Sequence, residues 1–301
     1  MWYDCHKVSS IEGYPLPWDK RDIDLALSAW DTHKFNAPWK QDDWKLELHR
    51  AGHIPGAAML HVETPNKSVL FSGDFDTRDS QLTIGAKPVK TDVLFVEGTY
   101  GGRDHPPKQE ENERFIERIV EVVDRGGTAL VPAFANGRTQ DVVMLLHKHL
   151  PELNVHVDGM GKRVAKLQME HPETLRDPSA LEEAWKWCRR VSSKSDRKKA
   201  LDADVIVSTS GMMDGGPSIW YLNRLRHDRK NAILLTGYQA RNLADVDCSK
   251  SEKFQFLVNL PTSTSMLTNI HSQHTQVTRK SSNLQKNVRL KMSLSTIPIR
   301  T

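Results

Sequence analysis

Three side chains that can act as acids, bases or metal ligands occur in one stretch of the chain, residues 49–101. They are His53 in AGHIPGA, Asp74 in SGDF and Glu97 in EGTYG. Each lies in or beside a glycine-containing turn at the end of a short apolar run. Side chains presented from loops at strand ends are the usual way in which a rigid sheet holds a site. The stretch therefore predicts a site at one edge of a sheet.

The apolar runs around these residues predict the strands that position them. Residues 44–48 and 58–62 flank the turn that contains His53 and have the short, bounded character of strands. The runs at 69–71 and 93–96 lead directly into Asp74 and Glu97. We expect four closely spaced strands over this part of the chain.

The three motifs, in this order and at these intervals, resemble those of metallo-β-lactamase-fold nucleases of the β-CASP group, which includes ribonuclease J and mRNA 3′-end nucleases. The resemblance implies that His53 is a zinc ligand, that Asp74 bridges two zinc ions as a catalytic carboxylate, and that Glu97 is a catalytic acid supporting the metal site. Zinc accepts imidazole nitrogen and carboxylate oxygen. Two metals about 3.5–4 Å apart clamp the attacking and leaving oxygens of a phosphodiester. The implied activity is metal-dependent hydrolysis of RNA.

The sequence departs from this family at its strongest motif, because no HxHxDH string occurs. His53 and Asp74 are then the only ligands implied, whereas catalytic zinc sites use three protein ligands. We therefore expect the chain to be weak or inactive by itself. The alternative is a non-catalytic RNA-binding or scaffold member that pairs with a homologous subunit. A DNA-processing member is a weaker alternative. His6 and His33 lie in polar segments and are interpreted as surface residues.

From Gly101 onward, apolar runs alternate with segments of helical period, which predicts a parallel sheet with helices on its faces. The fold class expected is α/β: a partial αββα metallo-β-lactamase domain followed by a Rossmann-like β-CASP domain with a parallel sheet. The expected helices are residues 22–30, 110–125, 139–150, 161–171 and 218–226, and the expected strands are residues 128–134, 154–158, 204–208 and 231–238. Residues 171–201 are interpreted as a helical excursion anchored by Trp185 and Trp187, with a solvated loop at 192–199.

Two glycine-containing loops of the second half are candidate RNA contacts. In PAFANGRTQ, Gly137 lets the backbone approach a ligand, and Arg138 can make a bidentate phosphate contact at the start of a helix. An ordinary strand-to-helix turn with a surface arginine explains the same residues. STSGMMDGGP resembles the family loop that lines the cleft between the domains, which implies RNA contacts from Ser208, Ser210, Gly211, Gly215 and Gly216. With VDGMG and LLTGYQ, the resemblance covers roughly residues 45–242.

Composition sets the broad class. Hydrophobic residues make up 38% of the chain and charged residues 27%, which is typical of a globular protein. No apolar run reaches the length of about 18 residues that a membrane helix needs, and no secretory signal is visible, so we expect a cytoplasmic protein with no membrane partner. The three cysteines are odd in number and far apart, which argues against a disulfide framework.

The expected domains are residues 1–101 for the first and 102–245 for the second, followed by a divergent tail over 246–301 whose composition favours disorder. The tail is rich in Ser, Thr, Asn and Lys and lacks glycine. Residues 243–301 carry a formal charge of +5, eight basic residues against three acidic ones, which exceeds the net charge of +4 of the whole chain. The part of the chain before it is nearly neutral, so bulk charge gives no independent argument for nucleic acid.

Overall fold

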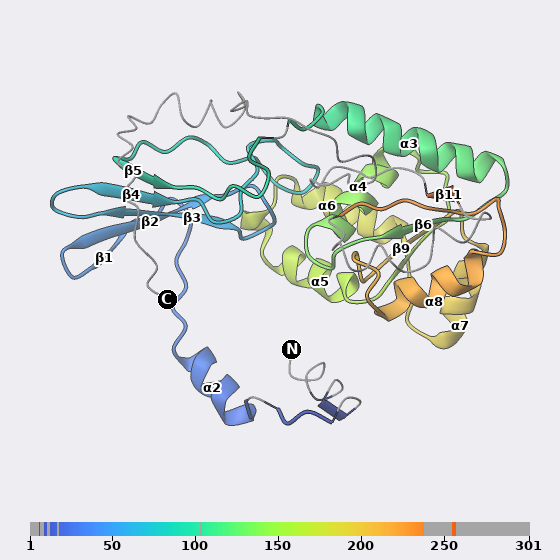
Figure 1. Ribbon diagram of the computed structural model, residues 1–301, viewed down its shortest axis with the longest axis horizontal. Helices are drawn as coiled ribbons and strands as arrows, with labels where there is room; N and C mark the ends of the chain where they lie inside the picture. Colours follow the sequence, from blue (N-terminus) through green and yellow to red (C-terminus); the bar gives the residue numbers. More distant parts are fainter. Residues whose placement is uncertain are drawn as a thin grey trace, which may run out of the picture.

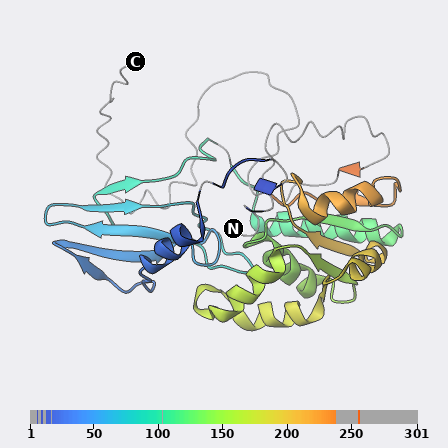
Figure 2. The ribbon, with the colours of Figure 1, turned by 90° about the horizontal axis from the view of Figure 1, so that it is seen from below.

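The structure, a computed structural model, describes residues 18–102 and 104–237, together with residues 6, 9–10, 13–16 and 255–256. Two sheets lie side by side along the long axis of the molecule (Figures 1 and 2). Within the described part of the chain, no helix is long and apolar enough to cross a membrane. The expected tail, including His271 and His274, lies outside the described residues except for the short strand at 255–256.

The first sheet has five strands in chain order, antiparallel except at its last pair. They are β1 (Trp39–Gln41), β2 (Trp44–Arg50), β3 (Ala58–Glu63), β4 (Ser68–Phe71) and β5 (Val93–Phe95). Helix α2 (Lys20–Ser28) precedes them and begins at Asp19, whose carboxylate accepts a hydrogen bond from the Asp22 backbone at 3.0 Å. The four strands predicted for this stretch are confirmed.

The second sheet has six strands, and every neighbouring pair is parallel. Their order is β11 (Gln255–Phe256), β10 (Ala232–Ile233), β6 (Ala129–Pro132), β9 (Val205–Ser208), β7 (Val155–Asp158) and β8 (Arg189–Arg190). The helices between them are α3 (Lys108–Asp124), α4 (Arg138–His149), α5 (Gly161–Glu170), η1 (Pro172–Thr174), α6 (Pro178–Trp187), α7 (Lys194–Lys199), η2 (Ala200–Asp202) and α8 (Gly216–Leu225). The expected parallel sheet of an α/β fold is confirmed.

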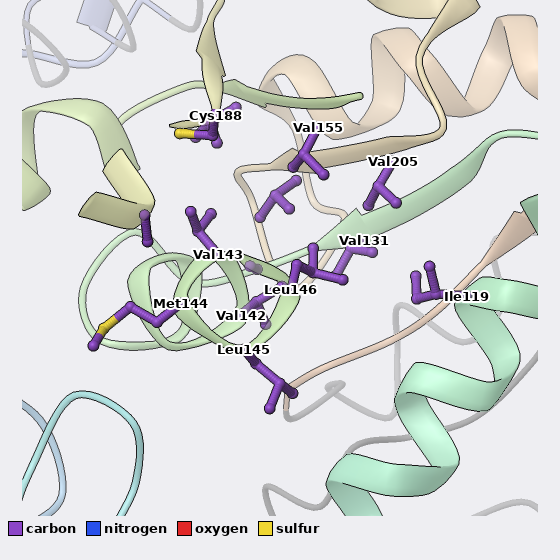
Figure 3. Close-up of a cluster of buried hydrophobic side chains, with 14 of the residues drawn as sticks. Ile119, Val131, Val142, Val143, Met144, Leu145, Leu146, Val155, Cys188 and Val205 are labelled. Atoms are coloured by element: carbon purple, nitrogen blue, oxygen red, sulfur yellow. The ribbon is translucent and has the colours of Figure 1, made fainter. Parts of the chain in front are cut away.

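Alternation along the strands divides the core of this unit into two layers. Val131, Val155 and Val205 face α4 and α3 in one buried cluster (Figure 3). Leu130 and Ile206, their neighbours in sequence, point the other way and pack with α8. Because successive strand residues face opposite sides, helices cover both faces of the sheet.

Residues 171–201 form the expected helical excursion, with one difference. Trp185 is buried, and the partly buried Trp187 donates from its indole to the Pro151 carbonyl at 2.7 Å. The solvated loop expected at 192–199 is wrong for residues 194–199, which form helix α7. The reason is a capping box, in which Ser193 and Asp196 satisfy each other's backbone amides at 3.0 Å.

Candidate functional site

The three motif residues of the first unit emerge at one edge of the five-stranded sheet. The edge collects the end of β2, the start of β3 and the ends of β4 and β5, because β4 and β5 are parallel to each other and antiparallel to β3. Hydrogen bonds join the loops: the Asp76 amide donates to the Ala51 carbonyl at 2.9 Å, and the Glu97 amide donates to Ser72 Oγ at 3.1 Å. The loops that contain His53, Asp74 and Glu97 are therefore adjacent.

Their side chains face different surroundings. His53 and Asp74 are exposed, and Glu97 is half-buried with its carboxylate accepting the Thr99 amide at 2.8 Å. In residues 18–102 and 104–237 and the few others described, no three His, Cys, Asp or Glu side chains are grouped so that they can hold a metal ion. The described residues therefore do not by themselves complete a zinc centre, and the assignment of His53 and Asp74 as zinc ligands stays a prediction.

The loops that carry the motifs of the second unit all follow the carboxyl ends of its parallel strands. Glycines allow these loops to interlock. A methyl group at Gly211 would lie 2.7 Å from the Phe134 amide nitrogen, and one at Gly159 would lie 2.0 Å from Thr209 Oγ1. The Thr209 hydroxyl also accepts the Met160 amide at 3.1 Å. This packing needs residues without a Cβ, which is a structural reason for the glycines in these motifs.

The loop of STSGMMDGGP is only partly available to a ligand. Ser208 is fully buried, and its hydroxyl lies 2.8 Å from that of Ser218. Ser208 lies beneath the loop in this structure, and its place among the RNA contacts stays a prediction. Gly211 is buried as well, whereas Ser210 is half-exposed and donates to the Asp214 carboxylate. The pair 215–216 lies near the surface at the start of α8.

Gly137 is buried against the first unit. Its backbone has a φ of +84°, and a methyl group there would lie 2.7 Å from Ile54 Cγ2. Ile54 follows His53 in the AGHIPGA turn, so this contact joins the loop with the predicted zinc ligand to the loop that opens α4. A close approach was expected at Gly137, but the group that approaches it here is a protein side chain.

Arg138 and Asp141 extend this junction. Asp141 accepts the backbone amides of Gln81 at 2.8 Å and Leu82 at 3.2 Å, both from the first unit. Arg138 Nη1 lies 3.6 Å from Asp141 Oδ2, and burial lowers the pKa of its guanidinium. Whether Arg138 also contacts RNA stays a prediction.

Leu82 fixes the two units to each other. It is only 2% exposed and belongs to the core cluster of the second unit, although it precedes that unit in the chain. Its carbonyl accepts the Arg176 amide at 2.9 Å, and the Arg176 guanidinium donates to the Ser80 carbonyl at 2.8 Å. An apolar anchor and a set of hydrogen bonds therefore hold the 79–85 loop on the second unit.

Charged groups surround this junction. Burial alone would raise the pKa of Asp76, but two hydrogen bonds from the Arg78 guanidinium at 2.9 Å and its positive charge lower that pKa instead. Burial lowers the pKa of Lys108, which Asp141 and Asp76 partly oppose. The positive charges at the junction are therefore matched mainly by protein carboxylates.

Sequence reasoning missed a second polar centre at the end of β7. Asp158 is 2% exposed and accepts hydrogen bonds from Arg197 Nε at 2.6 Å and from the Tyr221 hydroxyl at 3.1 Å. Burial raises the pKa of Tyr221, and Asp158 raises it further. The sequence did contain an indication of this centre, because in VDGMG an acidic residue ends a buried strand. Nothing near Arg197 in sequence indicates its partner.

The fold and these loops define an α/β protein in which the motifs of the second unit lie at the carboxyl edge of a parallel sheet. A family model described as Beta-Casp domain matches residues 139–243. Similar proteins include "Probable RNase MJ4" of Methanocaldococcus jannaschii, 36% identical over 249 residues, which are 79% of this chain and 58% of the relative. "RNase aCSPSF2" of Saccharolobus solfataricus is 30% identical over 239 residues, covering 77% of this chain and 48% of the relative.

A third relative is "Transcription termination factor FttA" of Methanocaldococcus jannaschii, 33% identical over 262 residues, which cover 79% of this chain and 41% of that protein. The chain belongs with these Beta-Casp proteins, whose names describe ribonucleases and a transcription termination factor. It spans about half the length of these relatives, 58%, 48% and 41% respectively.

Proposed function

We propose that this chain is the RNA-binding part of a metal-dependent ribonuclease, and that it has little or no hydrolytic activity by itself. The five-stranded sheet is assigned to a partial metallo-β-lactamase fold, and RNA lies along the carboxyl edge of the six-stranded sheet beside the loop of His53. The packing of Ile54 on Gly137 carries this proposal, because it joins the loop of a predicted metal ligand to the predicted RNA-binding edge.

The contacts proposed for RNA are those that remain accessible at this edge. They are Ser210, the backbone of 215–216 and the rim around Arg138. Small hydroxyl residues and glycines suit a backbone contact, because they let a phosphate approach main-chain N–H groups closely. Buried Ser208, Gly137 and Gly211 shape the edge from beneath.

The metal chemistry of the family is assigned only in outline. His53 and Asp74 are its proposed ligands in this chain, and Glu97 is its proposed supporting acid. Since catalytic zinc needs three protein ligands, ligands outside the described residues are required for a working centre. Zinc there would polarise the phosphodiester and supply a nucleophilic hydroxide.

The test measures bound zinc, RNA binding and RNA cleavage on the same preparation of the whole chain. We expect much less than two zinc ions per chain, binding of a single-stranded RNA by fluorescence anisotropy, and no more cleavage than a buffer control. Two tightly bound zinc ions with rapid cleavage would contradict the claim of weak activity. Absence of RNA binding would contradict the proposed function itself.

The scaffold alternative is favoured by the lack of a three-ligand group among the described residues. His53→Ala and Asp74→Asn separate the two proposals, with exposed His227→Ala as the matched control. If the chain retains part of a metal centre, the first two variants lower residual zinc binding and the control does not. If the chain is a scaffold, all three keep the zinc content and RNA affinity of the wild type.

A further inference from the structure

A pocket of about 230 Å³ lies at the ends of β7 and β8, where Asp158 and Arg197 are paired. Its lining contains three cationic side chains, two serines and one carboxylate. The residues that line it are Asp158, Lys162, Val191, Ser192, Ser193, Lys194 and Arg197. The volume suits a phosphate group with several waters, since a water molecule takes about 30 Å³ in the liquid.

Hydrogen bonds and ion pairs hold the charged side chains at the floor of the pocket in place. The Asp158 carboxylate accepts two hydrogen bonds from Arg197, at 2.6 and 3.2 Å, and lies 3.7 Å from Lys162 Nζ. Arg197 also lies over the ring of Trp220, with its Cζ 5.7 Å from the ring centroid. Lys162 Nζ also donates to the Val191 carbonyl. The two cations are therefore held at the pocket before any anion arrives, which lowers the cost of ordering them on binding.

The three cationic side chains that line the pocket outnumber the carboxylates around it. Asp158 lines the pocket, and the Asp196 carboxylate lies beside it, where it accepts the Ser192 and Ser193 amides at 3.2 and 3.0 Å. Within the described ranges Lys194 forms no ion pair. Lys194 is exposed at the rim, next to Ser192 and Ser193. Cationic donors around a small cavity favour an oxyanion, since charge-assisted hydrogen bonds are the strongest that such groups make.

The pocket also lies on the proposed RNA-binding edge. Met160, which follows the end of β7, donates its amide to Thr209 Oγ1 at 3.1 Å, so the pocket adjoins the 209–216 loop. Strands β6, β9, β7 and β8 are successive neighbours. With about 4.8 Å between neighbouring strands, the pocket lies about 10–14 Å from the end of β6.

We propose that this pocket binds a phosphate group. This phosphate is a backbone phosphate of the RNA, remote from the His53 loop, and that identity rests on the proposed function. That placement extends the RNA along the carboxyl edge from β6 to β8. The segment 192–199 then contributes an RNA contact through Lys194, although its sequence favours a solvated surface.

The test uses the double variant Lys162→Gln/Lys194→Ala and the single variant Lys194→Ala in the full chain. The matched control is Lys198→Ala, an exposed lysine of the same short helix that does not line the pocket. Arg197 is left in place, because its removal would leave a buried charge on Asp158. Thermal melting confirms that the variants fold.

Two measurements separate the sources of the phosphate. In the first, inorganic phosphate alone is titrated into the wild type, and the amide resonances of Ser192, Ser193 and Lys194 are followed by NMR. We expect saturable shifts that disappear in the double variant and persist in Lys198→Ala. In the second, affinity for a single-stranded RNA is measured against salt concentration. We expect Lys194→Ala to weaken binding about three- to tenfold and to reduce the salt slope by about 0.7.

The outcomes are distinct. Loss of the phosphate shifts together with weaker RNA binding supports the whole proposal. Loss of the shifts with unchanged RNA affinity and salt slope supports a site for a free phosphate-bearing molecule and overturns the RNA path. Phosphate shifts in a wild type that binds no RNA would contradict the proposed function and leave the pocket standing. If phosphate causes no shifts and the variants do not change RNA affinity, the proposal that the pocket binds phosphate is overturned.

Discussion

At the scale of single residues, the buried carboxylate of Asp158 shows how this fold tolerates a charge in its interior. Asp158 is 2% exposed, and its oxygens are satisfied by Arg197, Tyr221 and the Gly159 amide at 2.7 Å. A buried charge without such partners would be strongly destabilising. The hydrogen bonds around Asp158 are therefore a requirement for folding as well as a basis for the proposed phosphate pocket.

Tyr221→Phe tests this arrangement, because it removes one donor to Asp158 and keeps the packing of the ring. We expect the free energy of unfolding to fall by about 1.5–3 kcal/mol, the usual contribution of a hydrogen bond to a charged group. The measurement is urea denaturation at neutral pH. Tyr14→Phe is the control, because Tyr14 is 68% exposed. Equal effects of the two substitutions would contradict the role given to Tyr221.

The buried side chain of His156, also a single-residue feature, makes the stability of the fold depend on pH. It lies in β7, is 6% exposed, and its pKa is lowered by burial and then by the charge of Arg189. The unfolded chain therefore binds a proton at a higher pH than the folded chain, so stability falls as the pH drops below about 6.5. We expect His156→Gln to reduce that loss between pH 7 and 5, as measured by thermal melting. A steeper loss in the variant would refute the sign of the shift.

At the scale of elements, the loops at the carboxyl edge of the parallel sheet pack as one layer. Phe134 illustrates this, because Gly211 and Gly237 approach it so closely that a methyl group would lie 2.7 Å from its amide nitrogen and 2.5 Å from its ring, respectively. A strand end positions each loop, and glycines let the loops touch. The candidate RNA contacts depend on this layer for their positions.

Gly211→Ala tests the packing of these loops. The new methyl group meets backbone atoms that cannot easily move, so we expect a loss of about 1–3 kcal/mol in the free energy of unfolding, as for other overpacked sites. Gly98→Ala is the matched control, because a methyl group there meets nothing within 4 Å. The prediction fails if Gly211→Ala unfolds at the same urea concentration as the control.

Most elements were predictable because their periods are strong. The helix expected at 139–150 is α4, and the strand at 154–158 is β7, each within a residue at either end. The strand expected at 231–238 is confirmed only for Ala232–Ile233, since apolar composition alone does not fix where pairing ends. Helix α7 was missed because its capping residues, Ser193 and Asp196, lie in a run of charged residues that resembles a surface loop.

At the scale of the whole molecule, Leu82 joins the two units. It comes from the loop after the Asp74 motif, yet it is buried in the core of the second unit. Hydrogen bonds from Gln81 and Leu82 to Asp141 hold the same loop. We infer that the described parts of the two units unfold together.

Leu82→Ala is the corresponding test. We expect it to lower the free energy of unfolding by about 2–5 kcal/mol, the range for a leucine removed from a core. It should also separate one cooperative transition into two, seen as non-coincident melting by fluorescence and circular dichroism. The nearby Ile84→Ala is the control, because Ile84 is 36% exposed. A single, barely shifted transition in Leu82→Ala would show that the junction does not couple the units.

There is a physical reason why sequence patterns did not predict this junction. Periodicity reports which face of an element is buried, but not which element covers it. The junction is formed by residues in or next to loops, namely Leu82, Ile54 and Asp141. The pattern of the sequence around them does not indicate which residues they contact. The residue types at Gly137 and Arg138 favoured a contact with RNA, whereas in the structure Gly137 packs against Ile54 and Arg138 lies beside Asp141. The candidate site was therefore predicted as a set of loops, and their mutual contacts were not.

Photo-crosslinking of a bound single-stranded RNA, mapped by mass spectrometry, tests most directly whether RNA lies on the carboxyl edge of the six-stranded sheet. The account predicts cross-links to residues in the loops 133–138, 158–162, 191–194 and 209–217, competed by unlabelled RNA. Cross-links confined to the opposite edge of the sheet, where β6, β7 and β9 begin, or to the outer faces of α3 and α6, would contradict it.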